Sequence, residues 1–142
     1  MKVKEVMTVH PEMISANEPV INAARRMKEL NVGVLPVSQE DKLAGVVTDR
    51  DIVMRAVSER RDLNNTRISD IMSRGAFTCN EDSDVRDCAR VMEEKQVRRV
   101  VVTNNAGKPS GIVSVGDLAT KAGEELAGEV ISRVSQPSSP ER

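Results

Sequence analysis

The sequence almost lacks aromatic residues: Phe77 is the only one among 142 residues, and there is no Trp or Tyr. Proteins that bind single-stranded nucleic acids by stacking need several aromatic side chains, so that class is excluded. Charges of the two signs balance, with 21 Lys and Arg against 22 Asp and Glu. A chain with this balance has no general attraction for polyphosphates, and we expect no nucleic-acid partner.

Long hydrophobic runs are also missing. No window approaches about eighteen uninterrupted apolar residues, so the sequence predicts no membrane insertion. The first residues, Met1 to Glu5, lack the apolar stretch of a secretory signal, and we expect a cytoplasmic protein. The hydrophobic fraction of 39% is nevertheless large enough to build a core.

Cysteine and histidine are too few to build a disulfide framework or a metal centre. Cys79 and Cys88 show no C-x-x-C spacing, and we interpret both as small buried hydrophobic residues. A nucleophilic pair of a cysteine with His10, the only histidine, would need a third supporting group that the sequence does not show. We therefore predict no metal site and no catalytic residue.

The chain contains two copies of one pattern. With a shift of 65 residues, Val6-Met7-Thr8 aligns with Ile71-Met72-Ser73. One extra residue in the second copy changes the shift to 66, and Asp51 then aligns with Asp117. Register kept over about fifty residues with a single gap indicates an internal duplication.

Each copy is expected to fold in the order β-α-β-β-α. In the first copy we expect strands over 13–15, 32–37 and 43–47 and helices over 20–30 and 49–57. In the second copy we expect strands over 77–79, 97–103 and 111–114, a helix over 85–95 and a helix from Asp117. Asn17 is the expected cap of the first helix, and Pro36 favours an edge or irregular position for its strand.

A small sheet that helices cover on one face needs a partner for its other face, and the second copy can supply it. We therefore predict an α/β (α+β) protein whose two repeats pack as a pseudo-twofold sandwich. The expected boundaries are 1–57 for the first repeat, 58–67 for a polar linker, 68–122 for the second repeat, 123–134 for a C-terminal helix and 135–142 for a disordered tail. Leu126, Val130, Ile131 and Val134 are expected on one side of that helix.

The same short motif closes the last strand of each copy. It reads Gly45-Val46-Val47-Thr48-Asp49-Arg50-Asp51 in the first copy and Gly111-Ile112-Val113-Ser114-Val115-Gly116-Asp117 in the second. A structural interpretation is that the hydroxyl caps a helix and the carboxylate favours the helix start. A functional interpretation is that the carboxylate accepts hydrogen bonds from a ribose diol, beside a hydroxyl and amides that suit a phosphate. Apolar strand residues would then line an adenine slot.

These motifs, duplicated after Val/Ile-Met-Thr/Ser, resemble a tandem pair of cystathionine β-synthase (CBS) domains, a Bateman module, over most of the chain up to residue 122. The resemblance implies two clefts that bind adenosine compounds such as AMP, ADP, ATP, NAD or S-adenosylmethionine. It implies that Asp51 and Asp117 hold ribose and that Thr48 and Ser114 lie near ribose and phosphate. It further implies that Arg99 reaches phosphate and that Ile112 lies beside the second base.

The two copies differ where the resemblance places the phosphate contact. The first copy has Gly33-Val34 where the second has Arg98-Arg99, so the Asp51 cleft lacks that cation. Alternation along a strand puts Arg98 and Arg99 on opposite faces, so at most one of them points into a cleft. We therefore expect unequal clefts, with the stronger phosphate binding at Asp117.

Two functions remain open from the sequence. The first is a regulatory adenine-nucleotide sensor that needs no cofactor and signals to a separate, unidentified protein. The second is a ligand-free homodimeric interaction module in which the motif only caps helices. An enzyme is not expected, because neither Asp has a second general acid or base beside it. Exposed Ile52, Val53 and Leu118 on the short helices are expected to form a homodimer interface.

Overall fold

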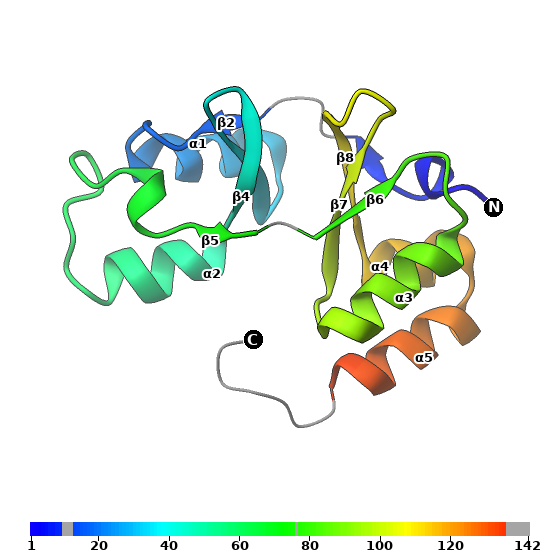
Figure 1. The fold of residues 1–142 in the computed structure, drawn as a ribbon. Coiled ribbons are helices and arrows are strands. Elements are labelled where there is room, and N and C mark those ends of the chain that lie inside the picture. The colour runs from blue at the N-terminus through cyan, green and yellow to red at the C-terminus, as the bar shows by residue number, and fades with distance from the viewer. Residues whose placement is uncertain (10–12, 76, 136–142) are drawn as a thin grey trace. The chain divides into compact units, whose positions relative to one another are not determined.

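The computed structural model describes residues 1–9, 13–75 and 77–135. The chain divides into two compact units (Figure 1). Unit 1 combines Met1–Pro11 with Phe77–Arg142, and unit 2 is Glu12–Ala76. Each unit contains a four-stranded sheet with helices packed against it. This mixed architecture confirms the predicted fold class.

Unit 2 is built on the sheet order β2-β3-β4-β5, in which β2 runs parallel to β3 and the other pairs are antiparallel. Its elements are β2 (Ile14–Ser15), α1 (Val20–Leu30), β3 (Val34–Gln39), β4 (Lys42–Thr48), α2 (Asp49–Ile52), η2 (Val53–Val57), η3 (Ile68–Asp70) and β5 (Ser73–Arg74). The helix α2 continues directly into η2, which has the wider π-helical turn. Together they cover the predicted helix over 49–57.

The start of α1 is held by the chain that follows η2 rather than by a side-chain cap. Pro19 is the N-cap residue, with φ −68° and ψ 149°, so the expected cap by Asn17 is wrong. The N–H group of Val20 donates to the carbonyl of Thr66 at 2.8 Å. A free amide at the helix start is thereby satisfied by residues of the predicted linker over 58–67.

Pro36 lies in an interior strand, because β3 pairs with β2 on one side and β4 on the other. It is tolerated there because β2 reaches only Val37 and Ser38, so residue 36 has no ladder bond to supply on that side. The β3–β4 register shifts between Val37 and Ser38. The expected irregularity therefore occurs next to Pro36, but the expected edge does not.

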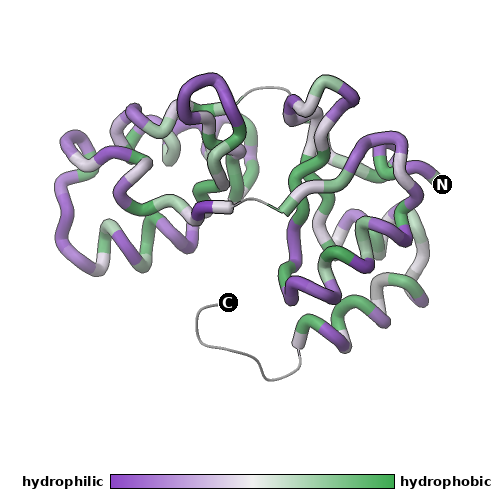
Figure 2. The backbone as a smooth tube through the Cα atoms, in the orientation of Figure 1, coloured by the Kyte–Doolittle hydropathy of each residue, from purple (hydrophilic) through white to green (hydrophobic). Residues whose placement is uncertain are grey.

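Unit 1 repeats this plan with the sheet order β1-β8-β7-β6. Its elements are η1 (Val3–Glu5), β1 (Thr8–Val9), β6 (Thr78–Asn80), α3 (Val85–Lys95), β7 (Arg99–Thr103), β8 (Pro109–Ser114), α4 (Val115–Asp117), η4 (Leu118–Ala122) and α5 (Glu124–Val134). The last helix, α5, packs on α3. Short hydrophobic and hydrophilic stretches follow one another along both helices, as expected for helices with one apolar side (Figure 2).

Each sheet is completed by a short strand from the beginning of the other repeat. The strand β1 lies in the first repeat but pairs with β8 of the second, placing Thr8 opposite Ile112. The strand β5 lies in the second repeat but pairs with β4 of the first, placing Ser73 opposite Val46. Gly45 and Gly111 permit this close approach, because a Cβ atom at either would collide with the backbone of the added strand.

Two of the apolar residues expected on the surface of the short helices are buried. Ile52 belongs to the core of unit 2 and Leu118 to the core of unit 1, so the predicted exposure is wrong for both. Val53, the residue after Ile52, is exposed as predicted.

The apolar side of α5 is narrower than expected. Val130 and Val134, one turn apart, are fully buried in the core of unit 1, and Leu126 packs against that core. Ile131 is 46% exposed, so its predicted place on the same side is wrong. Its Cβ lies about 100° around the helix from that of Val130, away from α3.

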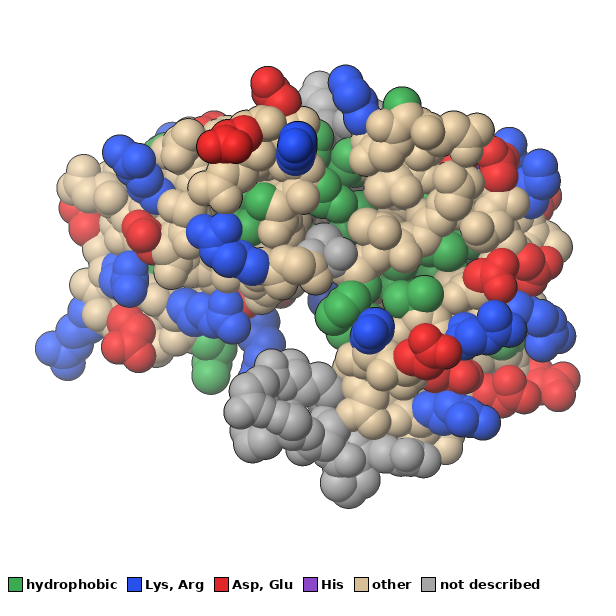
Figure 3. Space-filling model, in the orientation of Figure 1, with side chains coloured by type: hydrophobic (Ala, Val, Ile, Leu, Met, Phe, Trp, Pro, Cys, Tyr) green, Lys and Arg blue, Asp and Glu red, His purple; other side chains and the backbone are tan. Residues whose placement is uncertain are grey.

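The surface of both units carries acidic and basic side chains interspersed on the side drawn in Figure 3. Within the described ranges, no helix is both long and apolar enough to span a bilayer. The predicted disordered tail lies, apart from Ser135, outside the described residues, and so does His10.

Candidate functional site

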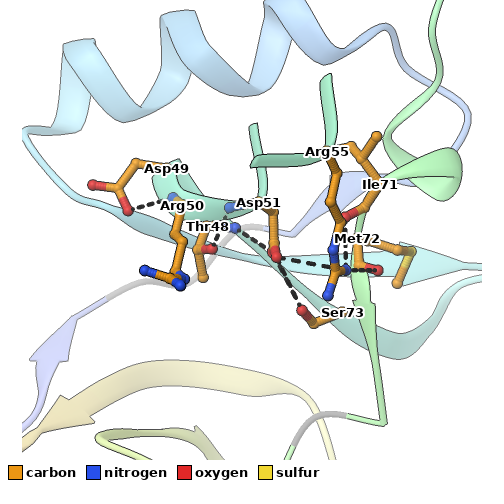
Figure 4. A network of polar contacts seen from close by, with 8 residues as sticks. All are labelled: Thr48, Asp49, Arg50, Asp51, Arg55, Ile71, Met72 and Ser73. Atoms are coloured by element: carbon orange, nitrogen blue, oxygen red, sulfur yellow. Dashed lines mark hydrogen bonds and ion pairs between the residues drawn. The ribbon is translucent and has the colours of Figure 1, made fainter. Parts of the chain in front are cut away.

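In unit 2 the candidate residues Thr48 and Asp51 form a capping box at the start of α2 (Figure 4). The hydroxyl of Thr48 accepts a hydrogen bond from the N–H of Asp51 at 3.0 Å, and the Asp51 carboxylate accepts one from the N–H of Thr48 at 3.0 Å. Two amides at the helix start are thereby satisfied. The structural interpretation of the motif thus holds for this copy.

The Asp51 carboxylate has two further partners. Ser73 on β5 donates its hydroxyl to the carboxylate oxygens at 3.2 and 3.3 Å. Arg55 Nη1 lies 3.6 Å from Asp51 Oδ1, and the same nitrogen donates to the carbonyls of Ile71 and Met72 at 3.1 and 3.2 Å. Asp51 is only 7% exposed, and the partners of its carboxylate named above all belong to unit 2.

Unit 1 builds the same box from Ser114 and Asp117. The N–H of Asp117 donates to the Ser114 hydroxyl at 3.1 Å, and the N–H of Ser114 donates to Asp117 Oδ2 at 2.9 Å. Thr8 on β1 takes the place of Ser73 and donates to Asp117 Oδ1 over a longer distance of 3.4 Å. Asp117 is partly exposed, and no ion pair among the described residues involves it. The two carboxylates therefore differ in accessibility.

Arg99 and Ile112 lie on the same face of the unit 1 sheet as Ser114. Strand pairing places Arg99 opposite Ser114, and residues two apart on a strand share a face. This face, here called the site face, consists of Thr8, Arg99, Val101, Ile112 and Ser114. The hydrophobic core of unit 1 contains the alternate residues Val100, Val102 and Val113.

The site face therefore combines an apolar centre with charged groups at one end. Val101 and Ile112 are buried side chains, whereas Arg99 is exposed. Arg99 makes no side-chain hydrogen bond or ion pair with any residue in the described part of the chain. Arg98 points elsewhere and contacts the hydroxyl of Ser135 at 3.3 Å. The predicted division of the two arginines between opposite faces agrees with this arrangement.

The equivalent position in unit 2 carries no charge. Val34 pairs with Thr48 as Arg99 pairs with Ser114, and it is 7% exposed. The cation missing from the first copy of the sequence is thus missing from this sheet as well. The structure brings Thr48 and Asp51 together in unit 2, and Arg99, Ile112, Ser114 and Asp117 together in unit 1.

Sequence reasoning did not single out Thr8, Ser73 or Arg55 as parts of the site. The alignment of Thr8 with Ser73 was a usable signal, because two hydroxyls at matching positions of both copies suggest a shared role. For Arg55 the signal was its spacing of four residues after Asp51, which places the two side chains on one side of a helical turn. Neither the aligned hydroxyls nor the spacing of Arg55 reveals that Ser73 contacts Asp51 and that Thr8 contacts Asp117.

The two cysteines belong to the core of unit 1 and stay outside the site. Cys88 is fully buried and Cys79 is 9% exposed, which confirms that both serve as small hydrophobic residues. A hydrogen bond from the Cys88 thiol lowers the pKa of Cys79 to about 7, and the same bond, followed by burial, raises the pKa of Cys88. Among the described residues, no group of three or more His, Cys, Asp or Glu is arranged to hold a metal ion.

Comparison with known proteins places these features in a family. The sequence model of the CBS domain matches residues 3–58 and 68–124. The uncharacterized protein YlbB of Bacillus subtilis is 37% identical over 138 residues, which cover 95% of this chain and 92% of that protein.

Solved structures of CBS proteins have the same fold. The CBS domain pair of protein MJ0100, in complex with 5-methylthioadenosine and S-adenosyl-L-methionine, is 27% identical with a TM-score of 0.72 and covers 84% of this chain and 98% of that chain. A CBS domain protein of Pyrobaculum aerophilum complexed with AMP is 24% identical with a TM-score of 0.77, covering 93% of this chain and 99% of that one. The chain therefore belongs to the CBS domain family and contains two copies of the domain.

Proposed function

We propose that the chain is a regulatory module that binds an adenosine-containing ligand, with the binding residues in unit 1. The observation that carries this proposal is the Asp117 carboxylate. It is fixed by the N–H of Ser114, is partly exposed, and receives only the long contact from Thr8 besides, among the described residues. An ionised carboxylate has about four acceptor positions, so Asp117 can accept hydrogen bonds from both hydroxyls of a ribose.

The other residues of the site face supply the remaining contacts. We propose that Ile112 contacts the base as an aliphatic neighbour, because the chain has a single aromatic residue; its side chain is 5% exposed, so the base would reach only its outer edge. Arg99 offers a guanidinium group whose side chain makes no hydrogen bond or ion pair with the described residues, and its planar fork matches a phosphate. Ser114, the last residue of β8, is paired with Arg99 and accepts a hydrogen bond from the N–H of Asp117. In this proposal Asp117 holds ribose, Arg99 holds phosphate and Ile112 contacts the base.

The ligands of related proteins support an adenosine compound. AMP, 5-methylthioadenosine and S-adenosyl-L-methionine, named in the two CBS structures above, share the adenosine group and differ in what the 5′ carbon carries. Asp117 and Ile112 would recognise the shared part, whereas Arg99 would favour an anionic substituent. We therefore propose a phosphorylated adenosine, such as AMP, as the preferred ligand.

We propose a regulatory role rather than catalysis. A carboxylate that acts with a nucleophile or with a second acid or base would have such a side chain beside it. The contacts of Asp117 within the described residues are a backbone amide and a hydroxyl. Binding would instead alter a surface that a separate protein reads, to the extent that the ligand prefers one conformation.

Replacing Arg99 with alanine tests the proposed roles. We expect Arg99→Ala to weaken AMP binding by about tenfold or more and to leave adenosine binding unchanged, because one charged hydrogen bond contributes about 1.5–3 kcal/mol. Isothermal titration calorimetry with both ligands measures this, and Arg98→Ala is the matched control. Equal losses for AMP and adenosine would show that Arg99 does not contact phosphate. Absence of binding of either ligand to the unaltered chain would reject the proposed function.

An apolar surface on η2 favours homodimerisation as a second property. Val53, Met54 and Val57 are each about half exposed and lie within the single turn of η2. We propose that a second copy of the chain covers them. Light scattering is expected to give twice the 15.5 kDa of one chain, and Met54→Asp is expected to give the single-chain mass. An unaltered chain that scatters as a monomer at micromolar concentration would contradict this.

A further inference from the structure

The two carboxylates of the repeated motif have different neighbours one helical turn later. Asp51 is followed four residues on by Arg55, and the aligned residue after Asp117 is Lys121. Arg55 contacts the Asp51 carboxylate, whereas Lys121 is exposed and makes no hydrogen bond or ion pair with the described residues. From this difference, and building on the proposed function, we infer that Arg55 closes the unit 2 site, so that the chain binds one adenosine ligand through Asp117.

Arg55 is held in the closing position by more than the carboxylate. Its Nη1 donates to the carbonyls of Ile71 and Met72, which precede β5 and are fixed by the pairing of that strand with β4. The π-helical turn of η2 carries Arg55 over these carbonyls (Figure 4). The guanidinium group thus links three acceptors, the two carbonyls and Asp51, and a ribose that approached Asp51 would have to displace it.

The Asp51 carboxylate has two hydrogen-bond donors and an ion-pair partner around it. The N–H of Thr48, the hydroxyl of Ser73 and the guanidinium of Arg55 all lie against a carboxylate that is 7% exposed. To donate both of its hydroxyls to this carboxylate, a ribose would have to displace at least Arg55. Asp117, held by one amide and one long hydroxyl contact, requires no such replacement.

Unit 1 offers the same acceptors to an arginine at position 121. The alignment of the repeats places Val6 and Met7 where unit 2 has Ile71 and Met72. In unit 2 the contacts to both carbonyls and to Asp51 are all made by Arg55 Nη1. A lysine ammonium also has three N–H donors, but Lys121 is exposed and makes no such contact with the described residues. The presence of lysine at this position therefore leaves the unit 1 carboxylate accessible, and Lys121→Arg would introduce the closing contact there.

Adenosine is the suitable probe, because it has no phosphate. Its binding therefore does not depend on a cation such as Arg99, whose counterpart in unit 2 is Val34. Titration calorimetry of the full chain is expected to give one equivalent of adenosine. Arg55→Met, which keeps the aliphatic stem and removes the donors, is expected to give two equivalents. Adding Asp51→Ala to Arg55→Met is expected to restore one equivalent.

The reciprocal variant keeps the inference testable if Arg55→Met folds poorly. Lys121→Arg changes an exposed side chain, and we expect it to weaken adenosine binding by about tenfold, the effect of one charged hydrogen bond. Two equal sites in the unaltered chain, a single equivalent with well-folded Arg55→Met, or unchanged affinity in Lys121→Arg would each overturn the closing role of Arg55. No adenosine or AMP binding at all would instead reject the proposed function, and this inference with it.

Discussion

Asp117→Ala is expected to weaken AMP binding by about two orders of magnitude, whereas Asp51→Ala leaves AMP affinity within about twofold of the unaltered chain. The difference arises because Asp117 would lose hydrogen bonds to two ribose hydroxyls, each contributing about 1.5–3 kcal/mol. Asp51 is enclosed by Thr48, Ser73 and Arg55 and is not offered to the ligand. Calorimetric titration with AMP measures both variants.

The two variants control for each other, because each loses the same capping box. We expect both to lower the free energy of unfolding by about 1–2 kcal/mol, the usual effect of losing a helix cap. Urea denaturation followed by far-ultraviolet circular dichroism measures this loss. Equal losses of AMP affinity in the two variants would contradict the assignment of binding to unit 1.

Gly45→Ala is expected to destabilise the protein by about 3 kcal/mol, the upper range for overpacking a filled site. A Cβ atom at residue 45 would collide with the carbonyl oxygen of Ser73 and come within 2.8 Å of Met72 Cε. The Ser73 carbonyl is backbone and is fixed by the pairing of β5 with β4, so it has no low-energy way to move. Urea denaturation measures the change.

Gly128→Ala is the matched control for this substitution. Gly128 lies within α5, and a Cβ atom there has no neighbour within 4 Å. Because alanine favours a helix over glycine by up to about 1 kcal/mol, this variant is expected to be slightly more stable than the unaltered chain. A Gly45→Ala variant as stable as Gly128→Ala would show that β5 does not approach β4 closely.

The sequence predicts the regular elements well because their periodicity is local. The helix expected over 20–30 is α1, and the helix expected over 85–95 is α3. Capping by Thr48 and Ser114 is likewise encoded within three residues of each hydroxyl. The features that the sequence does not predict are contacts between distant parts of the chain. Nothing near Pro19 reveals that Thr66 holds the start of α1.

In the candidate site too, the features that can be read from aligned residues are predicted, and those that depend on packing between distant residues are not. Arg99 and its missing counterpart Val34 are visible in the aligned repeats, and the strand registers place both as the alignment predicts. The enclosure of Asp51 is not visible there, because Ser73 arrives on a strand that the sequence assigns to the other repeat. Two matching motifs therefore have different surroundings, which only the packing of β5 and Arg55 reveals.

The exchange of β1 and β5 sets an order for folding during synthesis. Unit 2 is continuous in sequence, so all of it has left the ribosome once residue 76 has emerged. The sheet of unit 1 cannot be completed at that stage, because β1 has no partner strand until β8 has been synthesised, about a hundred residues later. The strand β1 is thus made before every strand of unit 2 but is paired after them, and the growing chain carries it unpaired while unit 2 can already fold.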